Sequence, residues 1–299
     1  MGGEKHRVGR RSGHRQFVRA RRQRCGVREA RAGDGTLNAL AEAFRSGRAD
    51  GRALLMPYLV CGYPTPEAFV SLAAACASAG ADVLEIGIPF SDPVMDGPVI
   101  QRATTAVLDR GLPTAEALEL VGAAAASAGI PVVVMTYYNI VYRWGLEKFS
   151  LAIASLRGSG VIVPDLVVEE AGSWRDACLA AGIAPVMLAA STSGPARLRA
   201  IADCTEGFVY ATSTLGVTGV RTILSEKARG LVAELRAVTK KPIAVGIGVS
   251  SAAHAQEVAG YADGVIVGSA IVKAIQETKE PVPAVHALVG ELRNAVAKR

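Results

Sequence analysis

The sequence predicts an α/β fold, a closed (β/α)8 TIM barrel with an extra N-terminal helix and a basic N-terminal extension. From Leu54 onward, eight short apolar segments alternate with longer segments that have the period of an amphipathic helix. Each short segment is apolar almost throughout, which is typical of parallel strands buried on both faces. Eight strand–helix units is the number that closes this type of barrel.

The expected strands are rich in Val, Ile, Leu or Tyr. They are Leu54–Val60, Asp82–Ile88, Pro131–Thr136, Val161–Val163, Ala184–Ala189, Gly207–Ala211, Pro242–Gly246 and Gly264–Val267. The expected helices between them include Pro66–Ala79, Thr114–Ala128, Leu146–Leu156, Glu169–Ala181, Leu224–Val238 and Ala252–Ala259. A further helix at about Leu37–Ser46 precedes the first strand and is expected to cover the amino-terminal face of the barrel.

An open, doubly wound sheet is the alternative arrangement for the same alternation of elements. Such a sheet usually carries a GxGxxG phosphate turn after its first strand. Here the first strand ends in Val60-Cys61-Gly62-Tyr63-Pro64, which does not fit that pattern. The barrel is therefore the preferred prediction.

Charge divides the chain into two expected regions. Residues 1–36 hold eleven of the 33 basic side chains and three of the 27 acidic ones, so residues 37–299 keep 22 basic and 24 acidic side chains. The first region is expected to be a disordered basic extension, and the second to be the TIM-barrel catalytic domain. Nucleic-acid binding and organelle targeting are the other interpretations of the extension. It has no recognisable nucleic-acid module and a single serine, Ser12, so we expect neither.

The five cysteines form neither a CxxC pair nor a cluster with histidines at metal-ligand spacing. We therefore expect no metal site, and we interpret four of the thiols as buried structural groups in a reducing cytoplasm: Cys61, Cys76, Cys178 and Cys204. No apolar run reaches the ~18–20 residues that span a bilayer, so no membrane association is expected.

Glu85 lies inside an otherwise apolar strand. A carboxyl group there is costly to bury without compensation, and burial would raise its pKa until it could donate a proton near neutral pH. A structural glutamate that pairs with a neighbouring strand is the other interpretation. The following loop carries Asp92 and Asp96 among three prolines, and two carboxyl groups in different environments commonly divide acid and base roles. A solvated turn would have the same composition.

Two glycine-rich segments follow the last two expected strands and predict a phosphate site. Gly246-Ile-Gly248-Val-Ser250 and Gly264-Val-Ile-Val-Gly268-Ser269 each end with a serine that we expect to cap a helix. Loops after strands 7 and 8 form the recurrent phosphate site of these barrels, because glycine lets backbone N–H groups approach the anion. Tight turns without a ligand are the alternative. A third segment, Ser213–Arg221, is glycine-rich and suits either a mobile lid or a static loop.

Several motifs resemble the tryptophan synthase alpha subunit family. The most specific is LEIGIPFSDPVMDGPVIQRA at 84–103, and the resemblance runs in order from about Leu37 to the carboxyl end. The other matching motifs are PYLVCGYPTPE (57–67), VVVMTYYN (132–139), VPDL (163–166), GFVYATSTLGVTGVR (207–221), KPIAVGIGVS (241–250) and YADGVIVGSAIV (261–272).

The resemblance implies a lyase reaction, the retro-aldol cleavage of indole-3-glycerol phosphate to indole and glyceraldehyde 3-phosphate. Glu85 matches the main acid–base residue of the family, and Asp96 matches the carboxylate that accepts a hydrogen bond from the indole N–H. The remaining site residues are implied by their positions in the motifs. They are Tyr137, Tyr210 and the lid residue Thr218 near the substrate, and Gly219, Gly248, Gly268 and Ser269 around its phosphate.

The resemblance also implies a partner, the tryptophan synthase beta subunit, in an alpha2beta2 tetramer. That subunit carries pyridoxal phosphate and receives indole through a tunnel, whereas the alpha chain needs no cofactor. Asp92, Pro93 and Asn139 match the docking face. Three positions depart from the common family pattern: Ile140, the pair Val167-Val168, and Ser191.

Two other functions fit the sequence less well. A related phosphate-binding barrel, such as phosphoribosylanthranilate isomerase or indoleglycerol-phosphate synthase, does not fit the spacing of Glu85 and Asp96. A catalytically poor scaffold that only activates a beta subunit does not fit the presence of both carboxylates and Thr218.

Overall fold

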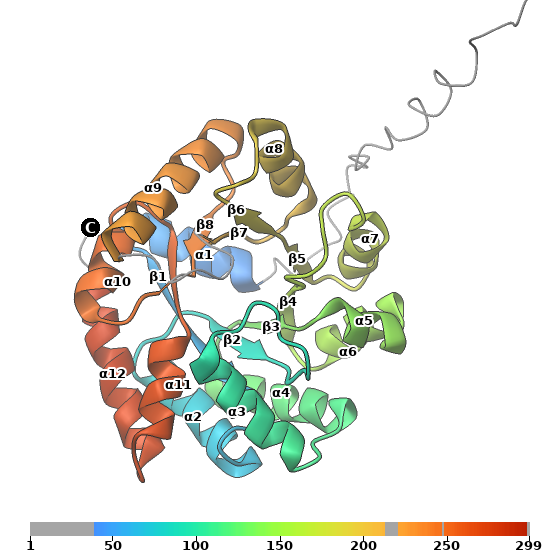
Figure 1. Cartoon of the computed structure of the whole chain (residues 1–299), viewed down its shortest axis with the longest axis vertical. Coiled ribbons are helices and arrows are strands. Elements are labelled where there is room, and N and C mark those ends of the chain that lie inside the picture. Colours follow the sequence, from blue (N-terminus) through green and yellow to red (C-terminus); the bar gives the residue numbers. More distant parts are fainter. Residues whose placement is uncertain (1–38, 213–220, 247, 298–299) are drawn as a thin grey trace, which may run out of the picture. The chain divides into compact units, whose positions relative to one another are not determined.

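The computed structural model of the chain describes residues 39–212, 221–246 and 248–297, in which a ring of helices surrounds a barrel of parallel strands (Figure 1). The strands are β1 (Leu54–Val60), β2 (Leu84–Gly87), β3 (Val132–Met135), β4 (Gly158–Ile162), β5 (Ala184–Val186), β6 (Leu188–Ala190), β7 (Val209–Thr212), β8 (Ile243–Val245) and β9 (Gly264–Val267). The predicted barrel is thereby confirmed.

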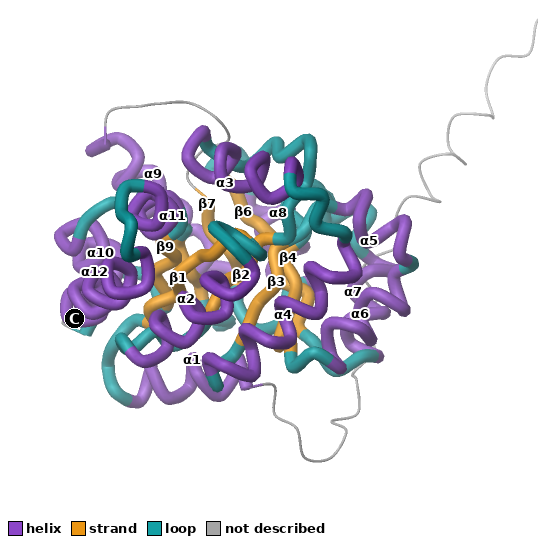
Figure 2. The backbone as a smooth tube through the Cα atoms, turned by 90° about the horizontal axis from the view of Figure 1, so that it is seen from below, coloured by secondary structure: helices purple, strands orange, loops and turns teal. Residues whose placement is uncertain are grey.

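The helices lie outside the strands, except for α1 at one end of the barrel (Figure 2). They are α1 (Ala39–Ala49), α2 (Pro66–Ser78), α3 (Pro98–Asp109), α4 (Thr114–Ala128), α5 (Tyr138–Trp144), α6 (Leu146–Ser155), α7 (Gly172–Ala180), α8 (Pro195–Cys204), α9 (Arg221–Val238), α10 (Ala252–Ala259), α11 (Ser269–Gln276) and α12 (Pro281–Val296).

The fifth predicted strand is divided in two at Met187, which makes nine strands where eight were expected. The sheet order is β5-β4-β3-β2-β1-β9-β8-β7-β6, so its two ends are consecutive in the chain. β5 pairs with β4, and β6 pairs with β7. Strands in a closed barrel are staggered, so the two neighbours of one strand meet it at different heights. The ring therefore closes through Met187.

β1 is shared between its neighbours in the same way. Its residues 54–57 pair with β9, and its residues 58–60 pair with β2. The ring thus consists of two hydrogen-bonded series of strands, β1 to β5 and β6 to β9. They join at β1 and at the divided strand β5–β6.

β4 begins at Gly158, three residues before the predicted start at Val161. Its first half, Gly-Ser-Gly, has no apolar run to signal a strand. The glycines are needed for close packing, because a Cβ on Gly160 would lie 2.9 Å from the carbonyl oxygen of Ala184, and one on Gly158 3.0 Å from that of Ile153. This part of the strand therefore forms because its backbone packs closely against its neighbours, and not because it buries apolar side chains.

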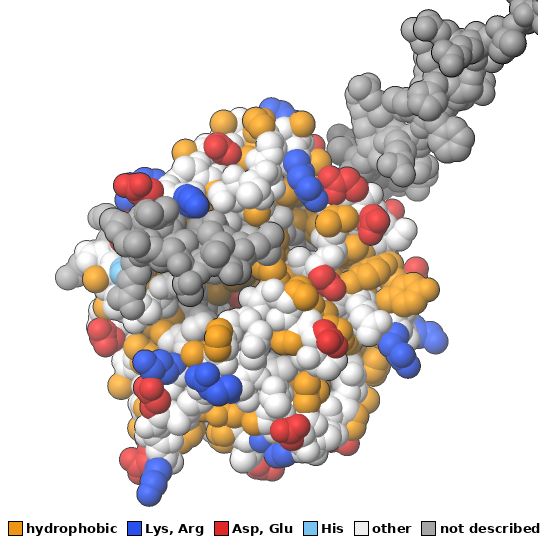
Figure 3. Space-filling view, in the orientation of Figure 1, with side chains coloured by type: hydrophobic (Ala, Val, Ile, Leu, Met, Phe, Trp, Pro, Cys, Tyr) orange, Lys and Arg blue, Asp and Glu red, His pale blue; other side chains and the backbone are white. Residues whose placement is uncertain are grey.

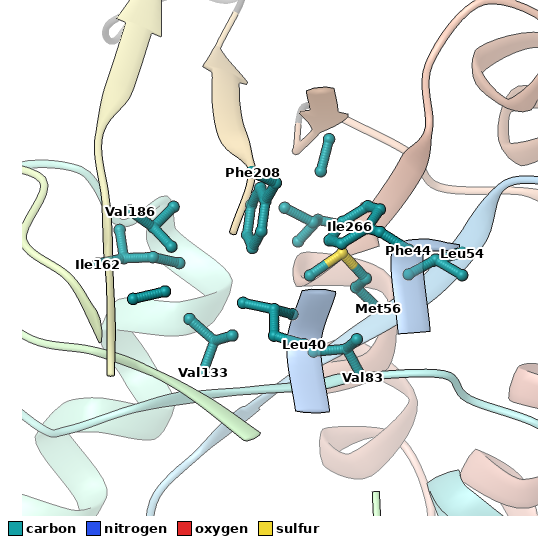
Figure 4. Close-up of a cluster of buried hydrophobic side chains, with 12 residues drawn as sticks. Leu40, Phe44, Leu54, Met56, Val83, Val133, Ile162, Val186, Phe208 and Ile266 are labelled. Atoms are coloured by element: carbon teal, nitrogen blue, oxygen red, sulfur yellow. The ribbon is translucent and has the colours of Figure 1, made fainter. Parts of the chain in front are cut away.

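α1 covers the amino-terminal end of the barrel. Its Leu40 and Phe44 are buried in a cluster that fills this end, with side chains from the surrounding strands (Figure 4). Gly207 makes room for Leu40, since a Cβ there would lie 2.8 Å from its Cδ2 atom. The opposite end, where the strands finish, stays open to a cavity.

The four cysteines of the described residues, Cys61, Cys76, Cys178 and Cys204, are free and buried, as predicted. No helix within these residues is both long enough and apolar enough to span a bilayer. The same residues contain no group of three or more Cys, His, Asp or Glu side chains that could hold a metal ion.

Candidate active site

Glu85 lies on β2 with its side chain toward the cavity at the carboxyl end of the barrel. In the strand register it lies between Tyr58 of β1 and Val133 of β3. It is 1% exposed, and its Oε2 atom has no hydrogen-bond partner among the described residues. Burial first, and then the nearby Asp96, raises the pKa of Glu85 to about 8. Most of this carboxyl group is therefore protonated at pH 7.

Asp96 lies in the loop that joins β2 to α3. Its N–H donates to the carbonyl oxygen of Pro93 over 3.3 Å, and its own carbonyl oxygen accepts from Nε2 of Gln101 over 2.9 Å. The backbone is thus held on both sides of a half-buried carboxyl group that lines the same cavity as Glu85. Burial raises the pKa of Asp96 to about 6, so this group is mostly ionised when Glu85 is mostly neutral.

The cavity has a volume of about 270 Å³ and combines an apolar wall with few polar groups. Such a lining is typical of a site for a small, largely apolar ligand that a few polar groups orient. The apolar wall includes Met95, Ile100, Met135, Ile162, Leu188, Val249, Ile266 and Ala270. Two further polar side chains, Tyr58 and Thr212, lie at inward positions of β1 and at the end of β7. Neither residue was predicted from the sequence to belong to the site.

Tyr210 of β7 also lines the cavity. Its hydroxyl lies over Gly246, where a Cβ would come within 2.6 Å of the tyrosine Cε1 atom. Gly246 was expected to belong to the phosphate site. The structure shows that its lack of a side chain makes room for Tyr210.

Tyr137 lies just outside the cavity lining and supports the loop of Asp96. Its ring stacks on Phe90 with centroids 5.0 Å apart, and its hydroxyl accepts a hydrogen bond from the backbone N–H of Met95 over 3.2 Å. Both contacts hold the segment between β2 and α3. Tyr137 was predicted to lie near the substrate, and here it contacts the residue that precedes Asp96.

The two glycine-rich segments lie on the same side of the cavity. Gly248 and Ser250 follow β8, while Gly268 and Ser269 follow β9, and all four line the cavity. Gly248 has φ +58°, a conformation that side chains disfavour. Gly268 immediately precedes α11, so backbone N–H groups at the start of that helix point toward this wall.

The helix caps differ from the sequence prediction. The residue that caps α10 is Ser251, whose side chain accepts from the N–H of His254 over 3.3 Å, and not Ser250. Ser269 is the first residue of α11, with Gly268 in the capping position. Ser250 and Ser269 are therefore left at the cavity wall. Thr218 and Gly219 lie outside the described residues.

Two of the expected docking residues, Asp92 and Pro93, lie on the loop after β2, whereas Asn139 lies on helix α5. Asp92 and Asn139 are exposed, and Pro93 is half-buried. Two large apolar side chains of the same loop and helix are also exposed, Val94 at 75% and Tyr142 at 67%. Apolar and acidic side chains share this face of the molecule (Figure 3).

Comparison with known proteins identifies the family. The family model for the tryptophan synthase alpha chain matches residues 44–297. The tryptophan synthase alpha chain of Streptomyces avermitilis is 44% identical over 260 residues, which cover 86% of this chain and 94% of the relative. That of Mycobacterium tuberculosis is 44% identical over 257 residues and covers the same shares.

Solved structures agree. A structure of Mycobacterium tuberculosis tryptophan synthase is 44% identical, with a TM-score of 0.81 over 87% of this chain and 98% of the other. The tryptophan synthase alpha subunit of Legionella pneumophila is 31% identical, with a TM-score of 0.80 over 87% and 99%. With its barrel, its paired carboxyl groups and these relatives, the chain belongs to the tryptophan synthase alpha chain family.

Proposed function

We propose that Glu85 and Asp96 perform the proton chemistry of the reaction that this family catalyses. That reaction, carried out by this chain, cleaves indole-3-glycerol phosphate to indole and glyceraldehyde 3-phosphate for tryptophan biosynthesis. The observation that supports the proposal is the pair of carboxyl groups in one cavity with pKa values of about 8 and about 6. At neutral pH one group can donate a proton while the other carries a negative charge.

Glu85 acts first as an acid and then as a base. Its carboxyl group protonates carbon 3 of the indole ring, which leaves a positive charge on the ring. The bond between this carbon and the glycerol chain then breaks, and its electron pair returns to the ring. At the same time the Glu85 carboxylate accepts the proton of the hydroxyl on the adjacent glycerol carbon, which becomes the aldehyde. Glu85 ends protonated, so the cycle is balanced.

Asp96 acts by charge. Its carboxylate accepts a hydrogen bond from the indole N–H and stabilises the positive charge that the ring carries after protonation. Its half-buried position makes this interaction stronger than it would be in water. Tyr210 contacts the substrate from the opposite wall, and Tyr137 keeps the Asp96 loop in place through Met95.

The phosphate group of the substrate binds at the glycine-rich wall. Gly248, Gly268 and Ser269 present backbone N–H groups there, and the N-terminus of α11 favours a negative charge. Gly219 and Thr218 are assigned to the phosphate and to the lid from their positions in the family motif alone. The site needs no basic side chain, since neutral N–H donors and the helix suffice to bind the anion.

The partner of the chain is the tryptophan synthase beta subunit, which receives the indole and carries the pyridoxal phosphate of the overall enzyme. We propose an alpha2beta2 tetramer in the cytoplasm, with Asp92, Pro93 and Asn139 at the interface. The exposed Val94, on the loop of Asp92, and the exposed Tyr142, on the helix of Asn139, would be covered by the partner. Four free, buried thiols suit a reducing compartment.

The test is indole release from indole-3-glycerol phosphate by the full chain with a saturating amount of beta subunit. Glu85→Gln keeps the shape of the side chain but cannot exchange the proton, so kcat should fall by at least ~10²–10⁴-fold. Glu234→Gln, an exposed substitution on α9, is the control and should match the wild type. Full activity of Glu85→Gln would refute the proposed role.

A further inference from the structure

Tyr58 carries a hydroxyl group on the same wall as Glu85. It is 5% exposed, lies at the register position of Glu85 on the neighbouring strand and lines the cavity. In a site with a largely apolar lining, the few polar side chains that face the cavity orient the ligand or one another.

Gly87 fixes the place of this hydroxyl. A Cβ on Gly87 would come within 2.7 Å of the tyrosine Cζ atom and still closer to its oxygen. The hydroxyl therefore lies two residues beyond Glu85 along β2, in the direction of the loop that carries Asp96. The ring is held from its other side by a cluster that includes Ala103 and Val107 of α3 and Val272 of α11.

Four ionisable side chains from different elements act electrostatically on Tyr58. They are Asp96, Glu85, Tyr137 and Tyr210, and among them Asp96 has the strongest effect. Burial and these neighbours raise the pKa of Tyr58 well above its usual range, so the group stays protonated and can act as a hydrogen-bond donor. Glu85 and Asp96 line the cavity together with Tyr58, and Asp96 is the one that is mostly ionised at neutral pH.

We propose that Tyr58 is a positioning residue that donates a hydrogen bond from its hydroxyl to the Asp96 carboxylate in the substrate-bound site. This proposal rests on the function proposed for Asp96. The hydrogen bond orients the carboxylate toward the indole N–H and keeps it ionised. Phenylalanine would fill the same space over Gly87, so the positioning role belongs to the hydroxyl and not to the ring.

The experiment compares Tyr58→Phe with the wild type, as full chains with saturating beta subunit. A donor to an ionised carboxylate lowers its pKa, so removal of the hydroxyl should raise the pKa of Asp96. The acidic limb of the kcat profile should move to higher pH by roughly one unit, as expected for the loss of one hydrogen bond to a charged group. At pH 7 this shift lowers kcat by only about twofold, and the lost orientation of the carboxylate should lower it further, while KM changes less than threefold.

Tyr261→Phe is the matched control, because this tyrosine lies beside α10 and outside the cavity lining. It should leave both limbs and KM unchanged. A Tyr58→Phe profile that superimposes on the wild type would overturn the proposal, as would a rise in KM with an unmoved acidic limb, which would mean that the ring only fills space. These outcomes are separate from the Glu85→Gln test, since the role of Glu85 would stand in either case.

Discussion

At the scale of single residues, burial divides the work between two carboxyl groups. Glu85 is enclosed by strands on both sides, whereas Asp96 lies on a loop and is partly hydrated. The same physical cause therefore raises both pKa values, but to about 8 in one case and about 6 in the other. No basic side chain is needed to separate the acid from the anion.

The alkaline limb of kcat/KM should therefore report Glu85. Above about pH 8 the group loses the proton that it must donate, and the rate should fall tenfold per pH unit. Asp96 contributes to the raised pKa of Glu85, so in Asp96→Asn the limb of the residual activity should move to lower pH. A profile that is flat to pH 10 would contradict this assignment.

The buried acid should also cost stability. The unfolded chain ionises Glu85 near 4.5, whereas the folded chain holds the proton until about pH 8. The folded state thus binds more protons within this window, and stability falls as pH rises through it. Glu85→Gln removes this penalty, so its gain in free energy of unfolding should grow between pH 5 and pH 8, by up to about 1.4 kcal/mol per unit. Urea denaturation at the two pH values measures the difference, and an equal effect at both would show that Glu85 titrates normally.

In two places a tyrosine ring lies over a glycine that has no side chain to obstruct it: Tyr58 over Gly87, and Tyr210 over Gly246. Gly246→Ala should push the Tyr210 ring out of place and lower kcat/KM by roughly tenfold or more, because small displacements in a site are costly. Gly230→Ala is the control, since a Cβ there meets nothing within 4 Å and alanine favours the α9 helix. Steady-state kinetics of both variants decide the matter. Wild-type kinetics for Gly246→Ala would show that the ring can move without loss.

At the scale of elements, α1 is a plug for the amino-terminal end of the barrel. Leu40 is fully buried against Gly160 and Gly207. Leu40→Ala should lower the free energy of unfolding by about 2–5 kcal/mol, the usual range for such a cavity. Indole release at 25 °C should stay within a few-fold, because the active site lies at the other end. A loss of stability below ~1 kcal/mol would show that the plug contributes little packing.

Strands were predictable from the sequence where apolar runs define them. β1 and β9 have the predicted bounds, and Glu85 was recognisable because a carboxyl group interrupts such a run. The break at Met187 was not predictable, since it depends on the stagger of neighbouring strands rather than on the residue itself. Helices α3, α5, α8, α11 and α12 are not among the helices that the sequence pattern predicted.

The roles of single cavity residues were less predictable than the strands. Tyr58 and Thr212 looked like ordinary strand residues, and only the register shows that they face the cavity. Gly246 belonged to a segment that predicted a phosphate site, whereas its contact with Tyr210 depends on a neighbouring strand. Such assignments need the distances between strands, which a sequence does not contain.

At the scale of the whole molecule, Asp82 joins distant parts of the chain at the amino-terminal end of the barrel. It accepts hydrogen bonds from the N–H of Leu55 over 2.8 Å and from Arg293 of α12 over 3.2 Å, and it pairs with Arg52 over 2.9 Å. Asp263 has a similar role before β9, where it accepts from the N–H of Ile243 and pairs with Arg236. The last helix is thereby tied to the first two strands.

Arg293→Met should therefore lower the free energy of unfolding by about 1–3 kcal/mol, the usual cost of losing a hydrogen bond to a charged group. Arg197→Met breaks an exposed pair with Glu169 and should cost less than about 1 kcal/mol. Thermal or urea unfolding of the two variants gives the comparison. Equal losses of free energy of unfolding would mean that the interaction of Arg293 with Asp82 stabilises the fold no more than an exposed ion pair does.

The seam at Met187 has a consequence for how the enzyme could be divided. Glu85, Asp96 and Tyr58 all come before this residue, whereas Gly248, Gly268 and Ser269 come after it. β5 ends the hydrogen-bonded series that runs from β1 through β2, β3 and β4, and β6 ends the series that runs from β9 through β8 and β7. A gene split at this codon would thus encode two half-barrels, one with the proton-transfer groups and one with the anion anchor. The substrate would then be the molecule that spans both polypeptides.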